Sequence, residues 1–332
     1  MVIHPWAWGI LALVAIGLVV IDFLGHARNP HPPTAAEAGR WTLFYVGLAA
    51  LFGVGIWLTN GWLYAQEFYA GWAMEWSLSV DNLFVFILIL KAFRVPRENQ
   101  QKALLLGIVI ALLLRLAFIL LGAALVSRFS WVFFIFGGWL LWTAVSQVRE
   151  TARGEEEDEE YHENGFIRLV RHVLPITDGF VGNRLLYRHG GHTYLTPLAV
   201  VVLALGSADL MFAFDSIPAI FGITQQAFLV FACNVFALMG LRQLFFLVDA
   251  LLSKLVYLGY GLGVILSFIG VKLILEALHA NTLPFINSGR GVEWAPNISV
   301  SVSLGVIVVT LAVTVVASLI RTAMDEGDAR ER

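Results

Sequence analysis

Charged residues are scarce in this sequence. Only 14% of its 332 residues are charged, whereas 59% are hydrophobic, and a soluble domain carries close to twice that share of charge. The composition therefore excludes a soluble globular protein, and no nucleic-acid partner is expected. It indicates an all-α, polytopic transmembrane helix bundle whose first partner is membrane lipid.

Cysteine is nearly absent as well. Cys233 is the single cysteine, so no internal disulfide can form. Because Cys233 lies in an apolar segment, a small buried hydrophobic residue is favoured over a redox group. The first apolar segment has no basic residues before it and contains Asp22, which favours a retained helix over a cleaved signal peptide.

What the sequence has in abundance is apolar runs near the length of about 20 residues that a helix needs to cross a bilayer. Nine such runs predict nine helices. The division is 1–147 with five helices, 148–193 as a cytoplasmic loop, 194–320 with four helices, and 321–332 as a cytoplasmic tail. The runs cover 6–25, 41–62, 68–92, 103–126, 131–147, 194–214, 228–248, 257–278 and 298–320.

Basic residues gather on one predicted side of the membrane. The loops after the first, third, fifth and seventh runs carry most of them, whereas the opposite loops carry only Arg128 and Arg290. Because Lys-rich and Arg-rich loops stay in the cytoplasm, we expect the N-terminus outside and the C-terminus inside. The localisation expected from this pattern is a bacterial cytoplasmic (inner) membrane.

The loop 148–193 holds three polar features. The run Glu155–Glu160 is either a solvated tract or an electrostatic collector for cations. Residues 166–175 resemble a short basic amphipathic helix on the anionic inner leaflet, and His189 and His192 are a weak metal-ligand signal. Protein partners are expected to contact this loop.

Two acidic blocks interrupt the apolar runs. Glu75 and Asp81 lie six residues apart in block 75–82, and Asp209 and Asp215 repeat the spacing in block 209–216. A charged side chain at the centre of a membrane helix costs about 2.5–3.5 kcal/mol, so such residues persist when paired, protonated or bound to a cation. The blocks therefore predict an ion site.

The two blocks run in opposite directions through the predicted membrane, which indicates an inverted repeat centred on the third and sixth helices. Such repeats are typical of transporters with a site at the midplane. Pro218 and Gly222 predict an unwound turn beside the second block. On an unbroken helix, residues six apart point about 240° away from each other, so either the first block also unwinds or its two acids serve different partners.

All the candidate ligands are oxygen donors, which favour Mn²⁺, Mg²⁺ or Ca²⁺. They are Glu75, Asp81, Asn82, Asp209, Asp215 and Ser216, with Asp22, Ser79 and Asn234 as additional candidates. Three alternatives stay open. Asp22 would reach water at a helix end, Asn234 would hydrogen-bond between helices, and the four central acids would form structural ion pairs. The basic partners for such pairs are Arg115, Arg242 and Lys272, which fall inside the apolar runs.

Metal and protons compete for carboxylate oxygens, so these acids predict exchange of a cytoplasmic divalent cation for external protons, with no organic cofactor. The sequences EWSLSVDNLFVF (75–86), FAFDSIPAIF (212–221) and NVFALMGLR (234–242) resemble the TerC/Alx family of integral membrane proteins. This resemblance implies nine helices, a cation-exporter-like core, manganese homeostasis and, in some members, tellurite resistance. It also implies that the four acids and Asp22 are family positions, and that Gly206 replaces a common Glu and Ala208 a common hydroxylated residue.

The function predicted from the sequence is export of divalent metal, with Mn²⁺ chosen over Ca²⁺ and Mg²⁺ by the resemblance. Two other classes remain. A non-transporting scaffold or assembly factor of the metal-stress or secretion machinery would tolerate loss of Asp81 or Asp215. An intramembrane aspartyl protease is disfavoured, because neither Asp lies in a Gly-x-Gly-Asp context and the Gly-rich stretch 259–263 holds no acid.

Overall fold

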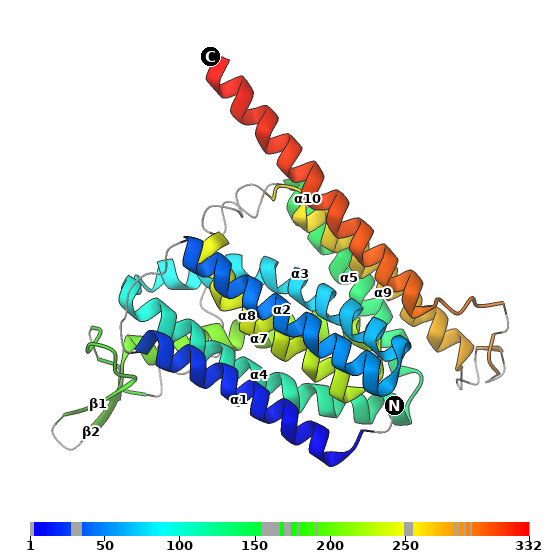
Figure 1. The fold of residues 1–332 in the computed structure, drawn as a ribbon, viewed down its shortest axis with the longest axis horizontal. Helices are drawn as coiled ribbons and strands as arrows, with labels where there is room; N and C mark the ends of the chain where they lie inside the picture. Colours follow the sequence, from blue (N-terminus) through cyan, green and yellow to red (C-terminus); the bar gives the residue numbers. More distant parts are fainter. Residues whose placement is uncertain are drawn as a thin grey trace.

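The computed structural model describes the whole chain except residues 1–2, 28–34, 154–166, 169–173, 178, 190–191, 249–254, 282, 284–285, 288–289, 293 and 332. The described residues form nine long helices and one hairpin (Figure 1). The helices are α1 (Pro5–Ala27), α2 (Ala35–Asn60), α3 (Trp62–Ala92), α4 (Arg97–Arg128), α5 (Val132–Arg153), α7 (Pro197–Phe221), α8 (Ala227–Val248), α9 (Leu258–His279) and α10 (Val300–Glu331). The expected all-α membrane bundle is confirmed.

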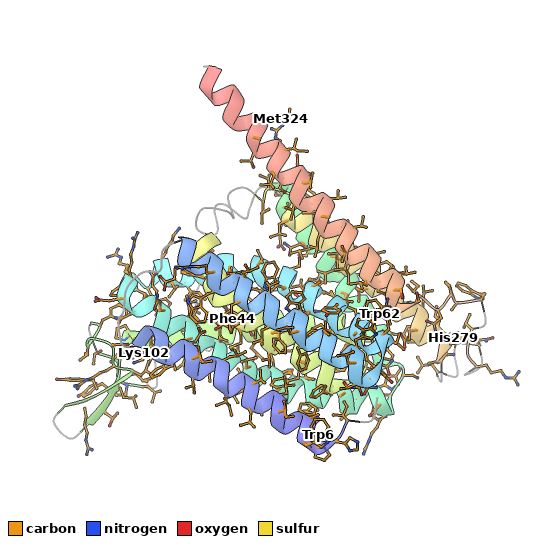
Figure 2. The ribbon with its side chains drawn as sticks, in the orientation of Figure 1. Trp6, Phe44, Trp62, Lys102, His279 and Met324 are labelled. Carbon is orange, nitrogen blue, oxygen red and sulfur yellow. The ribbon has the colours of Figure 1, made fainter. Side chains whose placement is uncertain are left out.

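Eight of these helices are long and apolar enough to cross a membrane. In α8 the apolar stretch of described side chains is shorter, Ala227–Leu241. Large apolar side chains such as Trp6, Phe44 and Trp62 are exposed along the helices (Figure 2), as lipid contact requires. Lys102 lies at the opposite end of the bundle from Trp6, Trp62 and His279, which agrees with helices that cross from one side to the other.

Several helix ends differ from the sequence expectation. Helix α5 continues past 147 to Arg153, and α10 continues through most of the expected tail. Helix α7 begins at Pro197, because the residues just before it form β1 (Leu186–His189) and β2 (His192–Leu195), an antiparallel hairpin that pairs His189 with His192. The acidic run 155–160 and most of the amphipathic segment 166–175 lie outside the described residues.

The expected unwound turn at Pro218 is wrong. Helix α7 runs unbroken through Pro218 to Phe221, and the backbone N–H of Gly222 donates to the carbonyl oxygens of Pro218 and Ala219. Pro218 removes one helical hydrogen bond, the one that an N–H at this position would donate to the carbonyl oxygen of Phe214, and the helix stays continuous on both sides of it. Helix α3 is likewise continuous through the whole of block 75–82.

The buried apolar side chains form two clusters. One holds together a larger helix group of α1, α2, α3, α4, α7 and α8. The other joins a smaller helix group of α5, α9 and α10 to the facing sides of α3 and α7. Figure 1 shows α5, α9 and α10 lying together along one flank of the bundle. The molecule thus has a boundary where the two helix groups meet.

Within the larger helix group, α3 packs on α8 about as extensively as α4 packs on α7. A two-fold relation that exchanges α3 with α7 and α4 with α8 predicts this equality, as in an inverted repeat. Glycine allows the close approach of α4 and α7. A Cβ on Gly206 would lie 2.8 Å from Ile110 Cγ2, and one on Gly107 would lie 2.9 Å from Leu205 Cβ.

Candidate cation site

A buried arginine lies at the centre of the acidic blocks. Arg115 of α4 is 0% exposed. Its Nε is 2.7 Å from Asp209 Oδ2 and its Nη2 is 3.1 Å from Asp209 Oδ1, a two-pronged ion pair. Its Nη1 donates to Glu75 Oε1, and to Ser216 Oγ at 3.2 Å. The same nitrogen donates to Asn234 Oδ1. We call Arg115 and these four acceptor residues the arginine ring. The acceptors belong to α3, α7 and α8.

The ion-pair alternative is therefore confirmed for Glu75 and Asp209. Asp209 and Ser216 are seven residues apart on α7, so both reach Arg115 from one face of an unbroken helix. Asp215 points elsewhere, as two acids six apart must on a continuous helix. Asn234 makes interhelical contact with Arg115 and also donates to its own helix at Val230 O.

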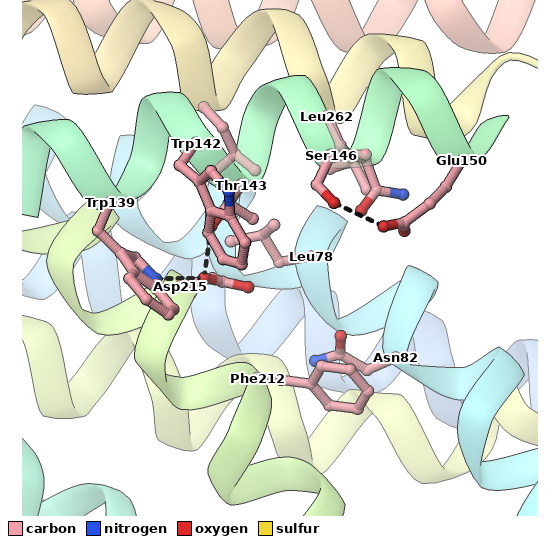
Figure 3. Close-up of a pocket in the computed structure, with 12 residues that line it drawn as sticks. Leu78, Asn82, Trp139, Trp142, Thr143, Ser146, Glu150, Phe212, Asp215 and Leu262 are labelled. Atoms are coloured by element: carbon pink, nitrogen blue, oxygen red, sulfur yellow. Dashed lines mark hydrogen bonds between the residues drawn. The ribbon is translucent and has the colours of Figure 1, made fainter. Parts of the chain in front are cut away.

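Asp215 faces a cavity of about 270 Å³ at the boundary between the two helix groups (Figure 3). Its Oδ1 accepts hydrogen bonds from Trp139 Nε1 at 2.7 Å and from Thr143 Oγ1 at 3.0 Å. Asn82 of α3 lines the same cavity and is 6% exposed. A half-buried carboxylate and a buried amide thus face one space, with the second carboxylate oxygen outside both hydrogen bonds.

Helix α5 supplies a polar wall that sequence reasoning missed. Trp139, Thr143, Ser146 and Glu150 recur at spacings of four, three and four residues, so they share one face of the helix and line the cavity. Ser146 Oγ donates to Glu150 Oε1 at 2.6 Å. The signal was present in the sequence, since polar residues at helical spacing in an otherwise apolar run mark a wet face.

A second polar stripe follows α3. Glu75, Ser79 and Asn82 are separated by four and three residues and so share a face. Among the described residues, the buried Glu75 Oε2 and Ser79 Oγ have no hydrogen-bond partner. The stripe connects the arginine ring at Glu75 with the cavity at Asn82. Buried polar atoms without partners call for an explanation such as a bound ion or water.

Other candidate residues lie apart from these two places. Asp22 is 1% exposed and accepts a 2.8 Å hydrogen bond from Tyr45 Oη, so the alternative in which it reaches water at a helix end is wrong. The side chains of Asp81 and Arg242 lie outside the described residues. Lys272 donates to Ser303 Oγ at 3.0 Å and makes no ion pair with a described carboxylate within 4.0 Å. The described side chains include no group of three His, Cys, Asp or Glu able to hold a metal.

The comparisons with known proteins agree with the family resemblance that the acidic blocks indicated. The sequence model described as "Integral membrane protein TerC family" matches residues 60–326. This chain belongs to the TerC family. The match covers α3 to α10, which hold both the arginine ring and the cavity. The family expected from the sequence is therefore confirmed, and so is an integral membrane protein.

Three similar proteins come from different organisms. The chain is 45% identical to an uncharacterised membrane protein of Mycobacterium tuberculosis, over 94% of this chain and 78% of the relative. It is 38% identical to the thylakoid membrane protein TERC of Arabidopsis thaliana, over 84% and 68%. It is 34% identical to Escherichia coli Alx, described as a membrane-bound redox modulator, over 93% of both chains. No solved structure matches this chain.

Proposed function

We propose that this TerC-family protein exports divalent metal, Mn²⁺ foremost, from the cytoplasm in exchange for protons. Asp215 and Asn82 bind the cation in the cavity at the boundary of the helix groups. The observation that carries the proposal is the cavity itself, where a carboxylate and an amide that are costly to bury line about 270 Å³ of space. The protein belongs in the bacterial cytoplasmic membrane, with its N-terminus outside.

The chemistry of the cavity suits a hard cation. Asp215, Asn82 and Thr143 supply carboxylate, amide and hydroxyl oxygens, which are ligands of Mn²⁺, Mg²⁺ and Ca²⁺. Trp139 and Thr143 both donate to Oδ1 of Asp215, which leaves Oδ2 for the ion. Water completes the coordination shell. The choice of Mn²⁺ within this class rests on the resemblance to the TerC/Alx family.

The position of the cavity suits alternating access. Ser146 and Glu150 continue the wall of the cavity to the end of α5, which the distribution of basic residues assigns to the cytoplasm. A cation passes Glu150 and reaches Asp215, and it displaces protons there because a carboxylate must be deprotonated to bind metal. Movement of one helix group against the other then exposes Asp215 to the outside, where protons release the metal.

Flux measurements on full-length protein in liposomes test the proposal. A trapped dye that Mn²⁺ quenches reports metal movement under an imposed pH gradient. Asp215→Asn is expected to abolish flux, because the amide has no charge to balance Mn²⁺. Glu98→Gln, which neutralises an exposed carboxylate at the start of α4, keeps full flux. Asp81→Asn tests the remaining acid of the first block.

Two results would overturn the proposal. Equal flux in wild type, Asp215→Asn and protein-free liposomes would remove the transport function. Flux that persists after the pH gradient is collapsed with an ionophore would remove the exchange for protons while keeping the metal path.

A second candidate is a non-transporting scaffold or assembly factor of the metal-stress or secretion machinery. The observation that favours it is the arginine ring, which gives Glu75 and Asp209 a structural partner. A scaffold tolerates Asp215→Asn but not loss of Arg115. A thiol redox role has little support from Cys233, which is fully buried and donates to Phe68 O.

A further inference from the structure

Arg115 has no part in the proposed cavity, yet it is the largest fully buried side chain among those described. Burying a guanidinium is costly unless every N–H finds an acceptor. Here the contacts run to Asp209 twice, and once each to Glu75, Ser216 and Asn234. Four polar residues thus contact one buried positive charge.

The acceptors of the arginine ring are the oxygen types that a hard divalent cation selects. They are two carboxylates, one amide carbonyl and one hydroxyl, contributed by three helices. With one positive and two negative groups, the ring keeps a formal excess of one negative charge. The guanidinium therefore lies where a metal ion would otherwise bind.

Two further oxygens beside the ring are unused. Glu75 Oε2 and Ser79 Oγ are buried, lie on one face of α3 and have no described hydrogen-bond partner. Guanidinium geometry is planar and fixed, so it satisfies Glu75 through Oε1 only. A spherical ion has no such restriction. These unsatisfied oxygens indicate that the ring offers more coordination than Arg115 uses.

We propose that Arg115 is a built-in cation that occupies a second oxygen site and keeps metal out of it. It is a positioning residue, and the inference rests on the proposed function of the neighbouring cavity. With Glu75 and Asp209 held by Arg115, the exchanged ions are confined to Asp215 and Asn82. Wild-type protein then binds one metal ion, although the acidic blocks contain carboxylates enough for two.

Equilibrium binding of Mn²⁺ to the purified full chain in detergent, read from the electron paramagnetic resonance signal of free Mn²⁺, tests this inference. Wild type is expected to bind one equivalent, which Asp215→Asn removes. Arg115→Gln is expected to bind two equivalents, because the ring loses its resident charge. Arg115→Gln with Asp215→Asn keeps one equivalent, and addition of Glu75→Gln removes that as well.

A structural role alone predicts a different result. Folded Arg115→Gln that binds the same single equivalent as wild type would overturn the inference. If Arg115→Gln does not fold, Arg115→Lys replaces it. The lysine keeps the charge but cannot hydrogen-bond to both carboxylates at once. Arg115→Lys is therefore expected to bind a second, weaker equivalent of Mn²⁺, which Glu75→Gln removes. Binding of a single equivalent, as in wild type, would again refute the inference. If wild type binds no metal and Arg115→Gln binds one equivalent, the cation site proposed in the cavity is refuted. The assignment of Arg115 to the second oxygen site is then supported.

Discussion

Asp215 is oriented by two donors on one turn of α5, Trp139 and Thr143, which both reach its Oδ1. A hydrogen bond to a charged group contributes about 1.5–3 kcal/mol, and here it fixes which carboxylate oxygen faces the cavity. Helices α5 and α7, which belong to different helix groups, therefore both contribute side chains to the candidate cation site. Any movement of α5 therefore changes the environment of Asp215.

Thr143→Val tests this arrangement, because valine keeps the shape and removes the donor. We expect the KM for Mn²⁺ flux to rise by roughly 10-fold, because Asp215 keeps only one of its two orienting donors and the cavity loses a hydroxyl oxygen. Thr59→Val is the control. Exposed Thr59 donates to carbonyl oxygens of its own helix and accepts from the neighbouring Asn60 Nδ2, and it does not line the cavity, so the KM stays at the wild-type value. An identical KM in both variants would show that Thr143 does not orient Asp215.

At the scale of elements, α5 and α9 form the most extensive helix pair, and glycine makes it possible. A Cβ on Gly137 would lie 2.8 Å from Gly270 O and 2.7 Å from Ile274 Cγ1. No real Cβ approaches a backbone oxygen that closely without displacement. The position of Thr143 and Trp139 therefore depends on the packing of α9 as well as on α5.

Gly137→Ala is expected to lower the stability of the protein by about 1–3 kcal/mol, because an overpacked contact forces the two helices apart. Gly138→Ala is the neighbouring control, since nothing lies within 4 Å of its added Cβ, and alanine in a helix stabilises by roughly 0.5–1 kcal/mol over glycine. Thermal unfolding in detergent compares the two. A common Tm for both variants would contradict the close α5–α9 contact.

Much of this element-level structure was predictable, because a bilayer imposes its own length on every apolar run. Each of the nine expected runs corresponds to one helix. The continuity of α7 through Pro218 was not predictable, because the sequence does not show whether tertiary packing holds a helix together where a proline removes one of its hydrogen bonds. Helical geometry predicted that the two acids of an unbroken block face different partners. It could not predict that Arg115 pairs with Glu75 and Asp209, because that contact depends on how α4 packs against α3 and α7. The polar face of α5 was visible in the sequence and was overlooked.

For the whole molecule, besides the hydrogen bonds to Asp215, two described polar contacts join the helix groups at the end opposite Glu150. Gln225 Nε2 donates to Glu276 Oε1 at 2.9 Å, and Ser301 Oγ donates to Gln66 Oε1 at 3.1 Å. Both join a residue of the larger helix group to one of the smaller. The cavity is lined as far as Glu150, so the proposed transport function requires this end to face the cytoplasm.

If the helix groups move against each other during transport, a covalent bridge across these contacts must stop flux. Gln225→Cys with Glu276→Cys, joined by a short bifunctional methanethiosulfonate that forms a disulfide with each cysteine, is expected to lose Mn²⁺ flux and to regain it on reduction. The native Cys233 is fully buried and does not compete for the reagent. The control bridge joins Tyr257→Cys and Ser318→Cys, which lie close together inside the smaller helix group, so it leaves flux unchanged. Full flux through protein whose thiols at 225 and 276 are shown by mass spectrometry to be completely bridged would rule out relative movement of the two helix groups at this end.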